Sequence, residues 1–305
     1  MYFDINSKNP LFEGAKTAVR KPHFVVAIFL SLFFIICGAL FGEIASQFLH
    51  EFVKIQDTTW RLTFNQFSEN ILLFAPIILI VYLWIKFYEK RSFSSLGFFP
   101  NQATSKIVSG LLIGAAMFSL IIIALYFTNN LAWQNGSIQT QGLQLFFPIL
   151  LIFFSFLVQG STEEIVIRGW LMPNIATTQK PWIAISISAA VFALLHGLNS
   201  NITVLAVFNL VLFGYFIAIF ALKQGSLIGA CVWHGIWNWL QGNVYGLEVS
   251  GNKNGLTLFN FIETGPDWLT GGKFGPEGGL AATIILIFAS LIALNLKNKP
   301  NLQTI

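Results

Sequence analysis

Apolar runs about as long as a bilayer is thick recur along this chain, and they constrain its fold more than any other feature. A helix needs roughly 20 apolar residues to cross the hydrocarbon core. Runs near that length are predicted to be transmembrane helices at 24–48, 70–88, 107–128, 142–167, 182–199, 202–222, 226–245 and 279–296. We therefore expect an all-α integral membrane protein, a bundle of about eight transmembrane helices.

The composition supports a membrane location. Only 10% of the 305 residues are charged, whereas a soluble domain carries about 25%. The 32 Phe and nine Trp residues suit the bilayer core and its interfaces. The net charge of +4 is spread over the loops, which argues against a nucleic-acid partner. Cys37 and Cys231 both lie in apolar runs, so we expect neither a disulfide framework nor a cysteine-based metal site.

Lysine and arginine residues gather in alternate loops, which predicts the orientation. Loops rich in these residues stay in the cytoplasm, so both termini of a multi-pass protein are expected there. The polar segment 1–23 is then a cytoplasmic tail, and it is too long and polar for a signal peptide. The glycine-rich segment 246–278 becomes an outer loop. Without internal repeats, residues 1–305 are interpreted as a single domain.

Glu163 and Glu164 lie inside the fourth predicted span, and Arg168 directly follows it. A charge at bilayer depth costs a few kcal/mol or more and is usually kept for function. Glu164 and Arg168 are four residues apart, the favourable spacing for a helical ion pair. Adjacent helical residues point about 100° apart, so Glu163 faces another direction and is free to act as a general base.

Two histidines and an asparagine lie in the fifth and seventh predicted spans. His196 follows Phe192 by four residues, so the two side chains share one helical face. His234 precedes Asn238 by four residues, so imidazole and carboxamide project together from another helix. With Glu163 on a third helix, these residues are expected to converge on a buried polar site.

Such a set of side chains suits peptide-bond hydrolysis. A glutamate and a histidine can hold and deprotonate a water molecule, and a histidine and an asparagine can donate hydrogen bonds to an oxyanion. Neither a GxSxG nor an HExxH motif is present. Glu163, His196 and His234 could instead bind zinc, with water in the fourth position. The spacing leaves the metal-free and zinc versions both open.

Three short motifs carry a family resemblance. EEIVIR matches EExxxR, FALLH matches FxxxH and HGIWN matches HxxxN. In this order, on successive membrane helices, they resemble the CPBP family of intramembrane proteases, which groups type II CAAX prenyl endopeptidases with bacteriocin-processing, Abi-like proteins. The corresponding core covers about 142–245.

The resemblance implies an eight-helix bundle whose site is buried from the cytoplasmic side. It implies that Glu163 and His196 activate water and that His234 and Asn238 form the oxyanion hole. Glu164, Arg168 and the Phe192 of the FxxxH motif would support this geometry. No cofactor is favoured, although zinc on Glu163, His196 and His234 stays the alternative.

The leading hypothesis is an intramembrane endopeptidase that cleaves a membrane-embedded or lipidated peptide. One rival is a proton-coupled transporter, in which Glu163, His196 and His234 form a proton relay. The other is a catalytically silent immunity or scaffold protein. Asn238 discriminates between enzyme and relay, because an oxyanion hole needs an amide donor and a proton relay does not.

The depth of the site can be estimated from the positions of the two histidines along their helices. At about 1.5 Å per residue, His196 lies roughly 22 Å along its helix from Pro181, whereas His234 lies only about 13 Å from Gly225. The two imidazoles are thus placed at different depths unless the fifth helix is tilted or begins along the interface. The site is expected between mid-membrane and the cytoplasmic side.

Overall fold

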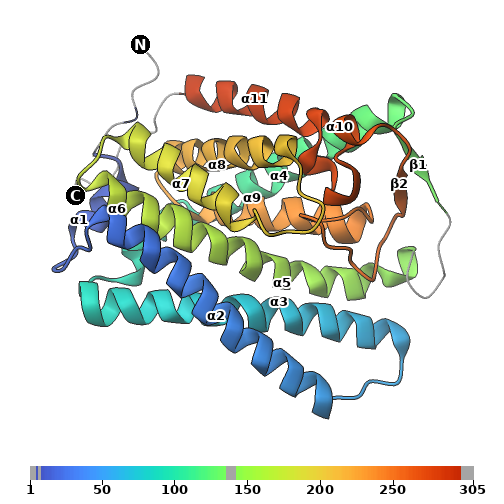
Figure 1. The fold of residues 1–305 in the computed structure, drawn as a ribbon, viewed down its shortest axis with the longest axis horizontal. Helices are drawn as coiled ribbons and strands as arrows, with labels where there is room; N and C mark the ends of the chain where they lie inside the picture. The colour runs from blue at the N-terminus through green and yellow to red at the C-terminus, as the bar shows by residue number, and fades with distance from the viewer. Residues whose placement is uncertain (1–4, 6–7, 135–141, 297–305) are drawn as a thin grey trace.

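The computed structural model describes residues 5, 8–134 and 142–296, and helices dominate them (Figure 1). The principal helices are α2 (Phe24–Phe52), α3 (Thr58–Leu83), α4 (Ala103–Phe127), α5 (Phe146–Glu164), α7 (Pro181–Leu195), α8 (Val204–Gln224), α9 (Ile228–Trp239) and α11 (Leu280–Asn295). Each of them overlaps one predicted span. The prediction of an all-α, multi-pass membrane protein is confirmed.

The number of crossings stays a prediction. Among the described residues, five helical stretches are long and apolar enough to span a bilayer, and α7 and α11 are apolar but shorter. The stretches are Phe24–Phe52, Thr58–Glu89, Ala103–Phe127, Leu143–Ala176 and Val204–Gln224.

Three helices continue beyond their α-helical part as π-helical segments. In these, backbone hydrogen bonds join residues five apart instead of four. These segments are Trp84–Glu89 after α3, Ile165–Leu171 after α5 and Leu240–Val244 after α9. The second leads directly into α6 (Met172–Ala176), so the helix that carries Glu163 extends well past it. Segments of this kind frequently occur at functional sites, and two of them adjoin the motif residues.

The remaining elements are short. They comprise α1 (Pro10–Lys16), α10 (Asp267–Thr270), strands β1 (Leu131–Trp133) and β2 (Phe261–Glu263), and 3₁₀ turns at Phe93–Leu96, Leu143–Leu145, Gly272–Phe274 and Pro276–Gly278. The strands pair antiparallel, with Leu131 opposite Glu263. They lie at the end of the bundle away from α1 and α6 (Figure 1).

Helix α9 is the centre of the bundle. It packs against α4, α5 and α8, while α3 packs against both α2 and α5. Helices α7 and α11 pack against α8. Close approach of α5 and α9 depends on Gly160, because a Cβ there would lie 2.7 Å from the backbone nitrogen of Gly235. The two helices that carry the acidic pair and His234 are thereby held backbone to backbone.

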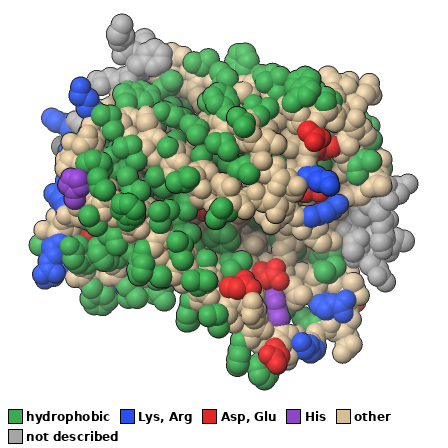
Figure 2. Space-filling model, viewed as in Figure 1, with side chains coloured by type: hydrophobic (Ala, Val, Ile, Leu, Met, Phe, Trp, Pro, Cys, Tyr) green, Lys and Arg blue, Asp and Glu red, His purple; other side chains and the backbone are tan. Residues whose placement is uncertain are grey.

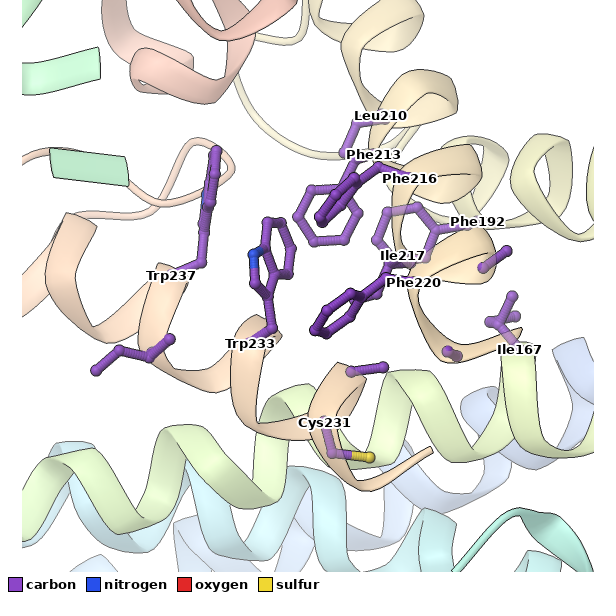
Figure 3. Packing of buried hydrophobic residues seen from close by; sticks show 14 of the residues in the cluster. Ile167, Phe192, Leu210, Phe213, Phe216, Ile217, Phe220, Cys231, Trp233 and Trp237 are labelled. Atoms are coloured by element: carbon purple, nitrogen blue, oxygen red, sulfur yellow. The ribbon is translucent and has the colours of Figure 1, made fainter. Parts of the chain in front are cut away.

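Aromatic rings fill the space between α7, α8 and α9 (Figure 3). The rings of Phe192 and Phe213 stack with their centroids 5.3 Å apart and their planes 2° from parallel. Trp233 meets Phe213 at 5.0 Å and Trp237 at 4.9 Å. Rings of this size bury much apolar surface, so the helices beside the site are rigidly joined.

The N-terminal end of the bundle is closed by packed side chains. Helix α1 contacts α6 and the turn Phe93–Leu96, and its Leu11 and Phe12 are almost fully buried. The Asn9 amide donates to the carbonyl of Leu222 at 2.8 Å. Part of the predicted tail 1–23 is therefore structured, while its cytoplasmic location stays a prediction.

A buried carboxylate joins two helices near this end. Glu89 Oε1 accepts hydrogen bonds from the indole nitrogens of Trp84 at 3.0 Å and Trp170 at 2.7 Å. Its other oxygen pairs with Arg91. Because Trp170 belongs to the π-helical segment after α5, this network fixes the helix just beyond the acidic pair.

The predicted outer loop 246–278 folds back onto the opposite end of the bundle. The Glu277 side chain accepts hydrogen bonds from the backbone N–H, at 2.8 Å, and from the hydroxyl of Ser250. The Asn209 amide donates to the backbone carbonyls of Glu277 and Gly279, each at 2.8 Å. Asn199, after α7, donates to the carbonyl of Ser250 at 3.0 Å. The loop is thus hydrogen-bonded to the end of α7 and the start of α8.

Candidate active site

Three predicted residues from three helices meet at one carboxylate oxygen. Glu163 Oε2, on α5, lies 3.8 Å from the Nε2 atom of His196, which caps the C-terminal end of α7. The same oxygen lies 3.8 Å from Nε2 of His234, on α9. It is buried and makes no hydrogen bond with the described residues. A separation of 3.8 Å exceeds a hydrogen bond, so the three groups surround a small space.

The orientation of His196 is set by the helix that it terminates. Its Nδ1 atom lies 2.9 Å from the carbonyl oxygen of Phe192, one turn earlier. A carbonyl oxygen only accepts, so Nδ1 carries the proton of this bond. In the neutral ring Nε2 is then an acceptor, and it faces Glu163. This is the tautomer that a proton-accepting imidazole needs.

Glu164 connects the guanidinium of Arg168 to the ring of His234. Its Oε1 atom accepts from Arg168 Nη1 at 3.1 Å and from His234 Nδ1 at 2.8 Å. The side chains of Glu164 and Arg168 are fully buried, and that of His234 is 3% exposed. The ion pair expected from the four-residue spacing is therefore present. It also orients the imidazole, a contact that the spacing could not reveal.

Phe192 lies between Arg168 and the candidate site: it contacts the guanidinium and lines the cavity. The guanidinium carbon lies 4.4 Å from the ring centroid, within the range of a cation–π contact. The same ring also contacts His196, at 4.6 Å between centroids. Phe192 thus supports the guanidinium and one imidazole at the same time.

Asn238 reaches the site through a residue that the sequence interpretation missed. The Asn238 amide donates to Gln159 Oε1 at 3.2 Å, and Gln159 Nε2 lies 3.5 Å from Glu163 Oε1. A carboxylate only accepts, so it fixes which end of the Gln159 amide faces it and, in turn, how Asn238 is turned. The available signal was the position of Gln159, four residues before Glu163 on the same helical face.

A cavity of about 530 Å³ is lined by Glu163, His196, His234, Asn238 and Gln159. One apolar part of its wall lies where α2 and α3 meet the π-helical segment after α5, and it includes Ile35, Leu73, Phe74, Ile77, Val166 and Ile167. Glu277 from the outer loop also lines it and was not predicted. Burial raises the pKa of the Glu277 carboxyl, and the hydrogen bonds from Ser250 partly offset this effect. A volume of this size suits a short peptide segment or part of a lipid chain.

The zinc alternative on Glu163, His196 and His234 stays a prediction, and the distances between the three groups are wider than those in a bound zinc site. Two ligand atoms on a tetrahedral zinc ion lie about 3.3 Å apart, given bonds of roughly 2.0 Å. Glu163 Oε2 is 3.8 Å from each imidazole nitrogen. In the part of the chain that the structure describes, no three His, Cys, Asp or Glu side chains are arranged to hold a metal ion.

The comparison with known families covers the part of the chain that contains these residues. Residues 144–240 match the family described as type II CAAX prenyl endopeptidase Rce1-like. No curated protein and no solved structure matches the chain. The matched segment runs from α5 to α9 and includes all three motifs together with the cavity residues that they contribute. This match agrees with the resemblance of the three motifs to the CPBP family of intramembrane proteases, over about a third of the chain.

Proposed function

We propose that the chain is an intramembrane endopeptidase that hydrolyses a peptide bond of a membrane-embedded or lipidated peptide. The observation that carries this proposal is the convergence of Glu163, His196 and His234 inside a cavity between helices. The apolar wall beside them offers a surface for an apolar side chain or a lipid chain.

In the proposed reaction, Glu163 and His196 hold the attacking water between them. The 3.8 Å separation of Oε2 and Nε2 leaves a bridging position for a hydrogen-bonded water. The water transfers a proton to Glu163 while its oxygen attacks the peptide carbonyl carbon. Collapse of the tetrahedral intermediate breaks the C–N bond, and Glu163 returns the proton to the leaving amine.

The oxyanion of that intermediate is assigned to His234 and Asn238. His234 Nδ1 carries a proton toward Glu164, and in the proposed step a second proton on Nε2, which the nearby carboxylates favour, lets the ring donate to the oxyanion. The charge of that ring is balanced by the two adjacent carboxylates, of which only Glu164 is paired with Arg168. Asn238 uses one amide proton for Gln159 and has a second one to donate.

The Asn238→Ala variant tests this assignment. We expect kcat to fall about 10²–10³-fold with little change in KM, because an oxyanion donor acts in the transition state. The measurement is cleavage of a quenched fluorescent peptide library by purified protein in detergent or liposomes. Asn295→Ala is the matched control, since Asn295 is exposed and its amide donates to the carbonyl of Leu291, one turn earlier.

The proposed peptidase function would be contradicted by two results together: wild-type protein cleaves no library peptide, and the Asn238→Ala variant keeps the cellular function. A proton-coupled carrier built on Glu163, His196 and His234 would give that result, because its relay does not need the carboxamide.

We further propose that this reaction proceeds without a metal ion. Prolonged dialysis against 1,10-phenanthroline is expected to leave kcat/KM unchanged, and metal analysis of active protein is expected to give far less than one zinc per chain. A carboxylate and two imidazoles spaced for a bridging water support this expectation. Loss of activity on dialysis that added zinc restores would establish the metal-dependent alternative.

A further inference from the structure

We propose that the cavity selects peptides that carry a lysine or arginine side chain on one side of the scissile bond and an apolar segment on the other. This selectivity rests on the proposed peptidase function, because it names the class of peptide that the same site cleaves. It follows from the charge of the cavity wall and from the separation of its polar and apolar parts.

Carboxylates outnumber cations on the cavity wall. Glu69 on α3, Glu163 on α5 and Glu277 just before α11 all line it. Lys253 is the only lysine or arginine among the described lining residues. The Arg168 guanidinium is not part of the lining and is paired inside the bundle. Charges interact more strongly where water is partly excluded, so the wall favours a cationic group over an anionic one.

Glu277 is a buried carboxylate with one oxygen left for a ligand. The residue is 8% exposed, and the backbone N–H and the hydroxyl of Ser250 both donate to its Oε1 atom. No hydrogen bond from the described residues reaches Oε2. Burial raises the pKa of this carboxyl, whereas the Ser250 hydroxyl and the imidazole of His196 lower it. A lysine or arginine side chain beside Oε2 would act in the same sense as the imidazole, because it stabilises the charged form.

The reacting groups lie between the polar and apolar parts of the wall. On the polar side, Glu277 is near enough to His196 for the imidazole to affect its pKa, and Nε2 of that imidazole lies 3.8 Å from Glu163. On the apolar side, Ile167 lines the cavity about one helical turn after Glu163. An extended peptide that crosses the site therefore meets carboxylates on one side of the scissile bond and apolar side chains on the other.

Glu69 extends the acidic character of the wall to the surface. Its Oε1 atom lies 3.8 Å from Nδ1 of His50, and its side chain is 51% exposed. Acidic and histidine side chains lie together over α2 and α3 on the face shown in Figure 2. An exposed pair of this kind contributes little stability, but a negative rim raises the local concentration of cationic peptides. Glu69 thus favours the approach of the same peptides that Glu277 would bind.

The selectivity is tested with three quenched fluorescent peptides that share an oligoleucine segment and differ in the residues on both sides of it, which are lysine, glutamine or glutamate. Purified wild-type protein is expected to cleave the lysine peptide with a kcat/KM about tenfold or more above that of the glutamate peptide, because like charges placed together are strongly unfavourable. The glutamine peptide should fall between them. Equal rates for the three peptides, or faster cleavage of the glutamate peptide, would overturn the proposal. This comparison needs no variant, so it decides the matter even if a substitution unfolds the protein.

Substitutions at position 277 assign the preference to a residue. Glu277→Gln keeps an acceptor for Ser250 but removes the charge, so kcat/KM for the lysine and glutamate peptides should come within about threefold of each other. Glu277→Lys should reverse their order. Asp267→Asn is the matched control and should keep the wild-type preference, because Asp267 is an exposed carboxylate of the same loop and is not part of the lining. An unchanged preference in Glu277→Gln would refute the assignment to Glu277.

Binding measurements separate this selectivity from the peptidase activity itself. Fluorescence anisotropy with the Glu163→Gln protein gives the Kd of each peptide without cleavage, and the lysine peptide should bind most tightly. If that order is found but wild type cleaves none of the peptides, the selectivity stands and the peptidase fails. If wild type cleaves all three at equal rates, the peptidase stands and the selectivity fails.

Discussion

Glu163→Gln is expected to reduce kcat about 10³-fold or more while leaving the protein folded. A general base commonly contributes about 10²–10⁴-fold, and the oxygen that it supplies here is buried and faces two imidazoles. Glutamine keeps the shape of the side chain and its contact with Gln159 but cannot accept the proton of water at neutral pH. The measurement is kcat with a peptide that wild type cleaves, alongside the melting temperature in detergent.

The double variant Glu163→Gln with His196→Ala tests whether Glu163 and His196 act on the same water molecule. Residues that act together on one water molecule are non-additive, so the double variant should lose little more activity than the single one. Glu51→Gln, an exposed carboxamide substitution at the end of α2, should retain full activity. Losses that multiply in the double variant would mean that Glu163 and His196 act in separate steps.

The helices were predictable from the sequence because each apolar run has the length that a membrane helix requires. The Glu164–Arg168 pair was predictable for a similar reason, since its spacing is local to one helix. Contacts between helices were not. Glu164 also orients His234, seventy residues away, and no local periodicity reports on such a contact.

The two histidines show where counting residues along straight helices fails. Their estimated depths differed by about 9 Å at 1.5 Å per residue, yet both Nε2 atoms lie 3.8 Å from one oxygen of Glu163. Helix α7 is only 15 residues long and ends immediately before His196, and α5 passes into the π-helical segment Ile165–Leu171. Helix ends and local changes in pitch decide the depth, and an apolar pattern does not define either.

Gln159 and Glu277 were missed for different reasons. Gln159 lies four residues before Glu163, on the same helical face. A single glutamine near the end of a membrane helix is common, however, and Gln159 belongs to none of the three motifs. Glu277 belongs to a loop whose fold depends on Ser250 and Asn209, residues that are distant in sequence. Only the three-dimensional structure brings such a loop to the wall of the cavity.

Arg168→Ala is expected to give the largest loss of stability. It would leave Glu164 as a fully buried charge without its guanidinium partner, a change that costs about 3–5 kcal/mol. It also removes the cation that lies 4.4 Å from the Phe192 ring. The melting temperature should fall on the order of 10 °C for a chain of this size. Activity should be lost because Arg168 holds the Glu164 oxygen that orients His234.

The matched control is Lys16→Ala. Lys16 and Glu13 form an ion pair at 2.8 Å with the two side chains 42% and 48% exposed, and such a pair contributes only about 0–1 kcal/mol. Its melting temperature should stay near that of wild type. A similar fall in both variants would show that burial of the Glu164–Arg168 pair has no special cost.

A second variant separates the structural role of the pair from its role in the site. Glu164→Gln with Arg168→Met removes both buried charges, and replacing a whole buried pair is often neutral or stabilising. We expect its melting temperature to recover most of the loss caused by Arg168→Ala. Activity should stay low. The neutral amide at position 164 still accepts a hydrogen bond from His234 Nδ1, but it does not balance the charge of the doubly protonated ring. Recovery of both properties would mean that the pair only fills space, and the assignment of His234 to the oxyanion would then lose its support.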